Sequence, residues 1–232
     1  MNKQEAQDAR LLLAAELCRD GARFADIGTD HAHLPLYLLG VGKIDSAVAA
    51  DIAEGPLARA KASVLAAGMQ DKVTLLLADG LSGMEELGLT DIAICGMGGE
   101  MIASILEAAP FVRDGAVRLI LQPMTRQDAL RRYLAEAGFA VLAERYAVSG
   151  GRAYLCLAAT YSGDAYEVGD IEAVLGDPAL RDGRDRDAFL AFLDAKEREV
   201  EGRLRGKRLG NAEVAAEEAL LAAITLEREN LL

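Results

Sequence analysis

Short apolar segments alternate with helix-compatible segments through most of the first 160 residues of this 232-residue chain. A helix is expected first, over residues 4–19, where apolar positions recur at helical spacing and Gly21 follows as a stop. We then place buried strands at 23–27, 46–50, 73–77, 91–95 and 117–121. Alternation of strand and helix is typical of a parallel sheet with helices on both faces. The pattern therefore predicts an α/β fold with a doubly wound sheet.

The end of the alternating region has a different pattern. Residues 139–148 and 154–160 are both β-like, and Ser149-Gly150-Gly151 between them is a hairpin signal. We therefore expect a seven-stranded, Rossmann-like sheet whose last strand inserts antiparallel. Class I methyltransferases have this arrangement, whereas the Rossmann domains of dehydrogenases do not end in this way.

The composition changes after residue 160, where a polar stretch begins. Residues 187–208 carry apolar side chains at helical spacing among dense charges, and residues 212–232 resume that spacing after a Gly-Asn turn. We expect an α-helical hairpin packed as a short coiled coil. The sequence thus predicts two domains, a methyltransferase domain over 1–160 and a helical hairpin over 161–232.

Charge and cysteine usage limit the possible partners and compartments. The formal net charge is −12, which counts against nucleic acid unless basic residues cluster locally. Cys18, Cys95 and Cys156 are far apart in the sequence, which argues for a reducing compartment and against a zinc site or disulfide framework. There is no signal-peptide pattern and no apolar run of about 20 residues. We expect a cytoplasmic monomer that binds no membrane and no metal.

Acidic residues or glycines follow each of the first four predicted strands. Because parallel strands end at one edge of a sheet, these residues should share a cleft. An S-adenosylmethionine site requires such a set: a carboxylate for the ribose, another for the adenine amine, and acids beside the sulfonium and ammonium. The candidates are Asp51 for the ribose, Asp79 for the adenine, Asp26 and Asp30 for the positive charges, and Gly28 and Gly96–Gly99 for close backbone approach. Asp51 alone fits a helix cap equally well.

The first loop carries the only two histidines, in the run FADIGTDHAHLP. Asp30, His31 and His33 together suggest a metal site, but the chain offers no third nitrogen ligand. We favour turn residues that hydrogen-bond locally, with His31 beside the cofactor or substrate.

Two later strand ends allow more than one interpretation. The glycines around Met97 form either a structural turn or a floor beneath the transferable methyl group. Gln122, before Pro123, either contacts an adenine edge or is an exposed loop residue. We expect Cys95 to be a buried strand residue rather than a nucleophile.

Basic residues cluster in two places, which are Arg126 with Arg131 and Arg132, and Arg203, Arg205, Lys207 and Arg208. Each cluster is either a solvated helix end or part of a positive patch for a polyanion.

The segments ADIGTDHAHLP, ADIAEGPLARA, ADGL, IAICGMGGEMI and LILQPM resemble, in this order and spacing, the bacterial tRNA (adenine(22)-N1)-methyltransferase family. The resemblance spans about residues 8–160 and extends more loosely over the C-terminal hairpin. It implies a class I methyltransferase domain followed by a coiled coil, S-adenosyl-L-methionine as cofactor and tRNA as substrate. The chain departs from the family pattern at Met124, where many members have Asn.

The resemblance and the residue patterns together give a set of expected site residues. The expected cofactor-binding residues are Asp26, Gly28, Asp30, His31, Asp51, Ile52, Asp79, Gly80, Gly96, Met97, Gly98 and Gly99. The expected substrate-binding residues are Gln122, Pro123, Arg126, Arg203, Arg205, Lys207 and Arg208. Asp30 is the catalytic candidate, because a carboxylate beside the methylated base would stabilise its positive charge or take the N6 proton.

Three other functions stay open from the sequence. A class I methyltransferase acting on another RNA, a protein or a small molecule fits the overall acidity. A nicotinamide-dependent oxidoreductase is disfavoured, because the first strand lacks a GxGxxG turn. A non-enzymatic adaptor built on the helical hairpin is disfavoured by the intact set of acidic strand ends.

Overall fold

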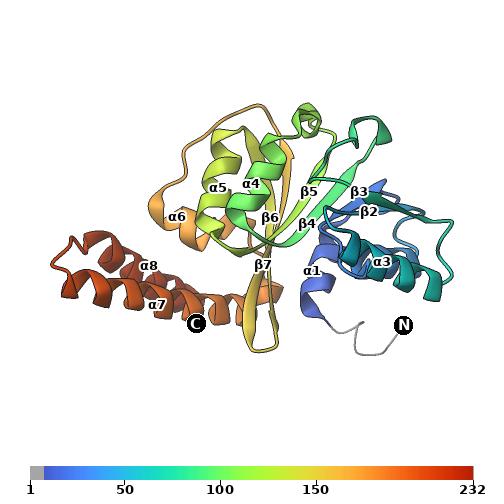
Figure 1. The fold of residues 1–232 in the computed structure, drawn as a ribbon. Coiled ribbons are helices and arrows are strands. Elements are labelled where there is room, and N and C mark those ends of the chain that lie inside the picture. The colour runs from blue at the N-terminus through green and yellow to red at the C-terminus, as the bar shows by residue number, and fades with distance from the viewer. Residues whose placement is uncertain (1–7, 232) are drawn as a thin grey trace.

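The computed structural model describes residues 8–231 of the chain (Figure 1). The strands are β1 Phe24–Ile27, β2 Ala47–Asp51, β3 Val73–Leu77, β4 Asp91–Gly98, β5 Arg118–Thr125, β6 Phe139–Ser149 and β7 Arg152–Tyr161. The α-helices are α1 Ala9–Leu17, α2 His33–Gly40, α3 Glu54–Ala66, α4 Gly99–Glu107, α5 Gln127–Glu136, α6 Asp170–Leu175, α7 Arg186–Leu209 and α8 Ala215–Leu231.

The strands form one seven-stranded sheet in the order β3-β2-β1-β4-β5-β7-β6. Strands β1 to β5 are parallel, and β7 lies between β5 and β6, antiparallel to both. This confirms the predicted doubly wound sheet with an inserted antiparallel strand. The order reverses direction between β1 and β4, so a crevice opens at the carboxyl ends of these two strands.

Alternate side chains of the central strands pack into two hydrophobic cores, one on each face of the sheet. Leu119 and Leu121 of β5 pack with residues of α4, α5 and α7, whereas Ile120 packs with residues of α1, α2 and α3. All three side chains are fully buried. Burial on both faces explains why these strands are continuously apolar in sequence.

The fourth and fifth strands are longer than predicted. Beyond Cys95 and Leu121 they stay paired, with Cys95 opposite Gln122 and Met97 opposite Pro123, and the register shifts on either side of Met97. An irregular ladder tolerates both a glycine at positive φ, Gly96 at +81°, and a proline without an N–H. Residues 96–98 therefore form a bulged strand end, and the structural turn that was one of the two alternatives for this segment is not present.

The N-terminal helix α1 is shorter than the predicted 4–19, and residues 4–7 lie outside the described part of the chain. Asp8 caps it by accepting a hydrogen bond from the Arg10 backbone N–H.

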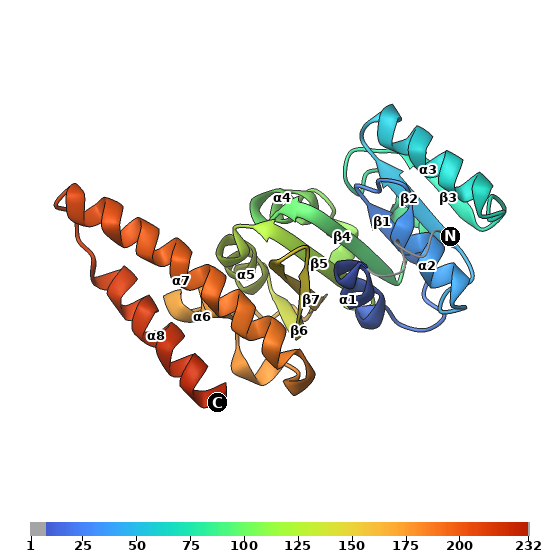
Figure 2. The ribbon, with the colours of Figure 1, turned by 90° about the horizontal axis from the view of Figure 1, so that it is seen from below.

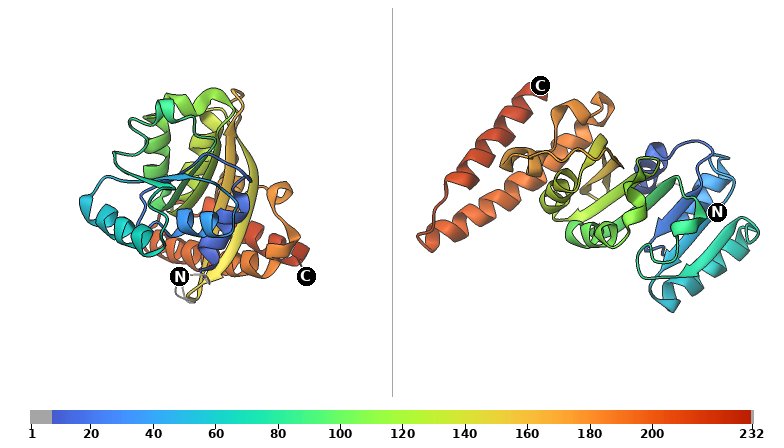
Figure 3. Two further views of the ribbon diagram at one scale, coloured as in Figure 1. Left: turned by 90° about the vertical axis from the view of Figure 1, so that its right-hand side faces the viewer. Right: turned by 90° about the horizontal axis from the view of Figure 1, so that it is seen from above.

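The predicted C-terminal hairpin is present as α7 and α8. It extends from the β6–β7 side of the sheet, at the opposite end of the molecule from α3 (Figures 2 and 3). Its base is not separate from the sheet, because Phe189 and Phe192 of α7 lie 4.8 and 5.1 Å from the Tyr146 ring of β6. These aromatic rings belong to the same core as the central strands. The division at residue 160 stays a prediction.

A buried ion pair ties this junction together. The Arg131 guanidinium donates to both carboxylate oxygens of Glu144, at 2.7 and 3.0 Å, and to the carbonyls of Ala173 and Val174 in α6. Tyr146 Oη donates to the same carboxylate at 2.6 Å. Arg131 is 4% exposed and Glu144 1%. Including Arg131 in a free basic patch was therefore wrong.

Arg131→Met should destabilise the protein by about 3–5 kcal/mol, because it leaves the Glu144 carboxylate buried without its cation. Urea unfolding measures the loss. Arg205→Met is the matched control: its pair with Glu201 spans 3.9 Å and Arg205 is 72% exposed, so it should change stability by less than about 1 kcal/mol. Equal small losses in both variants would contradict this account of the junction.

Candidate active site

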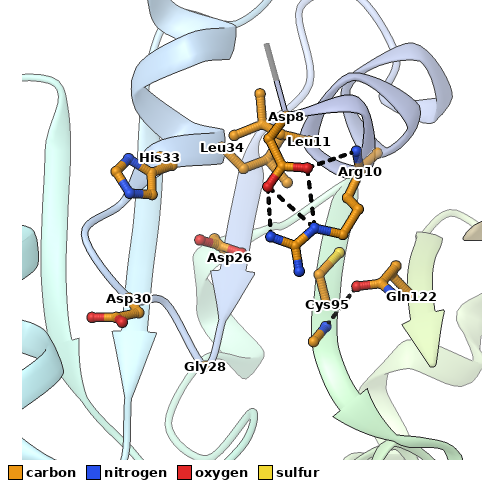
Figure 4. A pocket seen from close by; sticks show the side chains of 12 residues that line it. Asp8, Arg10, Leu11, Asp26, Gly28, Asp30, His33, Leu34, Cys95 and Gln122 are labelled. Carbon is orange, nitrogen blue, oxygen red and sulfur yellow. Dashed lines mark hydrogen bonds and ion pairs between the residues drawn. The ribbon is translucent and has the colours of Figure 1, made fainter. Parts of the chain in front are cut away.

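A pocket lies at the crevice between the ends of β1 and β4 (Figure 4). It encloses about 650 Å³, part of it open to solvent. It is lined by Asp8, Arg10, Leu11, Ala14, Asp26, Gly28, Asp30, His33, Leu34, Cys95, Gly96 and Gln122. The structure thus brings together residues of the first loop with the bulged end of β4 and the end of β5. These segments are far apart in sequence and meet only because β4 pairs with both β1 and β5.

Asp26 at the end of β1 is the buried acid of the pocket. It is 8% exposed, and one carboxylate oxygen accepts a hydrogen bond from Thr29 Oγ1 at 2.7 Å. The pKa of Asp26 is raised to about 6, mainly by burial and to a smaller extent by the nearby Asp51, while the Thr29 hydrogen bond opposes the rise. A buried carboxylate beside another acid favours a positively charged ligand group.

Gly28 gives the pocket a bare backbone wall. Its φ is +74°, and a Cβ built there would lie 2.1 Å from the Met97 methyl carbon. The Met97 side chain therefore lies directly against the first loop, and a side chain at position 28 would require its flexible end to move. The positive φ is the feature that favours glycine here.

Asp30 lies at the mouth of the pocket and is ion-paired. Its carboxylate accepts from Arg59 Nε of α3 at 2.8 Å, and His31 Nε2 lies 3.7 Å away. The Arg59 hydrogen bond lowers the pKa of Asp30 below its usual value. The rings of His31 and His33 stack at 5.2 Å.

The backbone at this mouth is strained. His31 and Ala32 have φ of +67° and +54°, a left-handed conformation that costs a residue with a Cβ about 1–2 kcal/mol. Such strain persists where the surrounding structure enforces it, and it concentrates at functional sites.

The ends of β2 and β3 continue the same edge. Asp51 accepts from the Ala53 N–H at 2.8 Å in the turn that precedes α3. The N-cap of α3 is Ala53 and no side chain caps this helix, so Asp51 does not have the predicted helix-cap role. The neighbouring Ile52 is an exposed apolar side chain, with an exposure of 66%. Asp79 and Gly80 follow β3, and the Gly80 φ of +56° requires glycine-like freedom.

Gln122 is buried, at 3% exposure. The alternative that it is an exposed loop residue was therefore wrong. Its Oε1 accepts from the Gly96 N–H at 3.0 Å and thereby fixes the bulge of β4. Cys95 beside it is half-buried. Its hydrogen bond with Cys156, together with burial, raises its thiol pKa well above the ordinary value, which agrees with the expected structural role.

Gly98 and Gly99 lead into α4, next to the loop that carries Arg126. A Cβ on Gly99 would lie 2.1 Å from the Arg126 carbonyl oxygen, so glycine permits this close approach. Arg126 pairs with Glu100 at 2.5 Å and remains 54% exposed.

The basic residues near the hairpin tip are all ion-paired. Arg203 pairs with Glu199, Arg205 with Glu201, Lys207 with Glu217 and Arg208 with Glu218, at 2.9, 3.9, 2.8 and 2.9 Å. Of the four, Arg203 lines a groove that also contains Arg126 and Lys196 and connects the end of β5 with α7. Arg132 pairs with Asp170 and is not part of this groove.

The sequence analysis missed the contribution of α1. Arg10 and Leu11 line the pocket, although we treated their helix only as a core element. The one available signal was an arginine beside the apolar stripe of the helix.

Within residues 8–231 no cluster of three or more His, Cys, Asp or Glu side chains is placed to hold a metal ion. No helix in this range is long and apolar enough to cross a membrane.

Comparison with known proteins gives consistent matches. Residues 7–157 match the model of a methyltransferase domain. The chain is 36% identical over 182 residues to the tRNA (adenine(22)-N(1))-methyltransferase of Bacillus subtilis, covering 78% of this chain and 74% of that protein. The crystal structure of the B. subtilis m1A22 tRNA methyltransferase has a TM-score of 0.75 at 28% identity, with 96% of both chains covered. Streptococcus pneumoniae Sp1610 in complex with S-adenosyl-L-methionine has a TM-score of 0.75 at 31% identity, covering 91% and 98%.

The strand order, the inserted β7 and the acidic crevice at the β1–β4 switch point define a class I methyltransferase domain. Within that class, the chain belongs to the tRNA (adenine(22)-N1)-methyltransferase family.

The raised pKa of Asp26 predicts a specific pH dependence of stability. The pKa rises from 3.8 to about 6 on folding, so only well below pH 3.8 is the acid neutral in both states. Between these values the folded protein binds more protons than the unfolded chain, and its free energy of unfolding falls as the pH rises, by up to about 3 kcal/mol in total. Urea unfolding from pH 4 to pH 7 measures this slope relative to Asp26→Asn, which keeps the acceptor for Thr29. Parallel profiles would contradict the assignment.

Proposed function

We propose that this protein transfers the methyl group of S-adenosyl-L-methionine to N1 of an adenine in tRNA, at position 22. The observation that carries the proposal is the Asp26–Gly28 pocket: a buried carboxylate and a glycine wall at the switch point of a methyltransferase sheet. The relatives named for this activity cover most of the chain, which supports the same substrate here.

The residues present fit the cofactor. Asp26 would face its positively charged amino-acid end, Gly28 would lie against that end, and Asp51 would accept from the ribose hydroxyls. Ile52 would support the adenine, with Asp79 and Gly80 at its edge. When bound, the cofactor supplies an activated methyl group on a sulfonium. The glycines after Cys95 would form the floor beneath that methyl, and Met97 would move off Gly28.

The protein's own contribution to the reaction is positioning and charge. The N1 lone pair of a neutral adenine attacks without prior deprotonation, so the site must align N1 with the methyl. The new N–C bond leaves a positive charge on the base. We propose that Asp30 stabilises that charge; its ion pair with Arg59 keeps the carboxylate ionised, which supports this role. Its lowered pKa makes it a weak base, so we favour electrostatic stabilisation over removal of the N6 proton.

The target base must be unpaired or flipped out of a helix, because pairing buries its N1 edge. We propose that the flanking RNA follows the groove from Arg126 past Lys196 to Arg203. Gln122 lines the pocket and Met124 lines the groove, so Pro123 joins the two along β5. We further propose that the protein works as a monomer in the cytoplasm.

Incubation of unmodified tRNA with the protein and S-adenosylmethionine should produce 1-methyladenosine, detected by mass spectrometry of the nucleosides. Asp51→Ala should weaken cofactor binding about tenfold or more, since it removes a charged acceptor for the ribose. Asp20→Ala, an exposed acid outside the pocket, is the control and should change nothing. Cofactor binding without any 1-methyladenosine would indicate a methyltransferase of another substrate.

Asp30→Asn should keep cofactor affinity but lower the rate of single-turnover methylation, because the charge beside the product base is lost. An unchanged rate would remove Asp30 from the catalytic assignment.

The groove proposal distinguishes two arginines on α7. Arg203→Ala should weaken tRNA binding and reduce its dependence on salt, because one phosphate contact is lost. Arg205→Ala, two positions along the helix and outside the groove, should have a smaller effect. Filter binding between 50 and 200 mM salt tests both. An effect shared equally among Arg203, Arg205, Lys207 and Arg208 would instead support docking at the hairpin tip.

A further inference from the structure

Gln122 is a buried amide whose two ends are bound unequally. Its side chain lines the pocket beside Cys95 and Gly96 (Figure 4). The Oε1 atom accepts a hydrogen bond from the Gly96 N–H at 3.0 Å. The Nε2 atom carries two hydrogens, and among the described residues its one acceptor is Met124 Sδ at 3.4 Å. Because a thioether is a weak acceptor, this buried donor at the edge of the pocket lacks a strong partner.

The Gly96 N–H fixes the orientation of this amide. An amide turned by about 180° would place its NH2 group against the Gly96 N–H, and two donors would then face each other. The amide oxygen therefore stays on the side of Gly96, and the NH2 group stays on the side of Met124. The oxygen keeps one lone pair free, since an amide oxygen can accept two hydrogen bonds. Gln122 thus offers an acceptor and a donor in a fixed order.

Gln122 also lies where the pocket meets the groove proposed for RNA. It lines the pocket, and Met124, two residues further along β5, lines the groove that contains Arg126 and Arg203. Its hydrogen bond with Gly96 connects it to the glycine segment that we place beneath the transferable methyl group. A base that enters the pocket from the groove would therefore pass the Gln122 amide.

Adenine carries the complementary pair of groups on the edge formed by N6 and N7. Its N6 amine donates and its N7 accepts, and a glutamine amide binds both at once through its oxygen and its NH2 group. Contact at N6 and N7 leaves the N1 lone pair free, which methyl transfer to N1 requires. Guanine has the acceptor O6 in place of the amine, so the fixed oxygen of Gln122 would face a second acceptor.

We propose that Gln122 binds the target adenine through N6 and N7, and that the Gly96 N–H holds the amide in the orientation that this contact needs. The inference rests on the proposed function, because it takes an adenine of tRNA as the target base. It deepens that function by naming the atoms of the base that are recognised. It also gives Met124 a role, since its sulfur holds the NH2 group until the adenine N7 replaces it.

The direct test changes one atom of the base. Single-turnover methylation of a tRNA with adenosine at the target position is compared with that of the same tRNA carrying 7-deazaadenosine, in which a C–H group replaces N7. The wild-type protein should methylate the 7-deaza tRNA about tenfold more slowly, because the Nε2 donor loses its acceptor. Transfer of labelled methyl from S-adenosylmethionine measures both rates. This comparison uses no variant, so it tests the proposal even if a substitution at Gln122 disturbs the fold.

Gln122→Glu assigns the effect to this side chain. The carboxylate keeps the size of glutamine and an acceptor for the Gly96 N–H, but it lacks the NH2 donor. The variant should methylate the two tRNAs at equal rates or prefer the 7-deaza tRNA. Its affinity for S-adenosylmethionine, measured by calorimetry, should stay within about twofold of the wild-type value. Gln70→Glu, the same exchange at an exposed residue outside the pocket, is the control and should keep the wild-type ratio of rates.

Equal rates for the two tRNAs with the wild-type protein, or an unchanged ratio in Gln122→Glu, would overturn the proposal while leaving the proposed function intact. Loss of cofactor binding by a folded Gln122→Glu protein would assign the amide to the cofactor and would overturn it as well. A wild-type protein that binds S-adenosylmethionine but methylates neither tRNA would show that the proposed substrate is wrong, and the proposal would fall with it.

Discussion

The site depends on one unfavourable feature, the burial of the Asp26 carboxylate at the end of the central strand β1. Burial raises its pKa to about 6 and the negative charge of Asp51 adds to the shift, while the Thr29 hydroxyl alone compensates in part. A carboxylate placed in this way gains most from a cationic partner. The positive end of a sulfonium amino acid is such a partner, and we propose that the unfavourable burial of Asp26 in the free protein gives selectivity for the cofactor.

The backbone around this site is constrained by close contacts at glycines and by left-handed conformations. Gly99 permits a backbone contact with Arg126 that a Cβ would block, and Gly28, His31, Ala32 and Arg126 adopt left-handed backbone conformations. Gly99 begins α4, and the others lie on loops at the carboxyl edge of the sheet. The two hydrophobic cores and the Arg131–Glu144 pair anchor the elements that hold these loops, so the rigid part of the molecule and its strained part are separate.

Much of the fold can be predicted from the sequence because its signals are local. Strand length, helical spacing and the Ser149–Gly151 hairpin signal are sufficient for a seven-stranded doubly wound sheet. That topology in turn predicts that the acids after the first three strands lie at one edge of the sheet.

The contacts made over long sequence distances were not predictable. Whether Arg131 points to solvent or to Glu144, and whether Gln122 is exposed or bound to Gly96, depends on how strands pack in three dimensions. Arg10 was missed for the same reason, since nothing local shows that α1 reaches the pocket. That β4 continues through Gly96 to Gly98 was not predicted, because glycines indicate a turn and a bulged strand equally well.

The central claim is that Asp26 carries the charge that receives the cofactor. Proton release on binding of S-adenosylmethionine tests it most directly, measured by calorimetry at pH 6 in buffers of different ionisation enthalpy. Near its pKa, Asp26 is about half protonated in the free protein and must ionise fully beside the bound cation, so about half a proton should be released. Asp26→Asn should abolish this release. Binding with no release from the wild-type protein, or with the same release from the variant, would contradict the account.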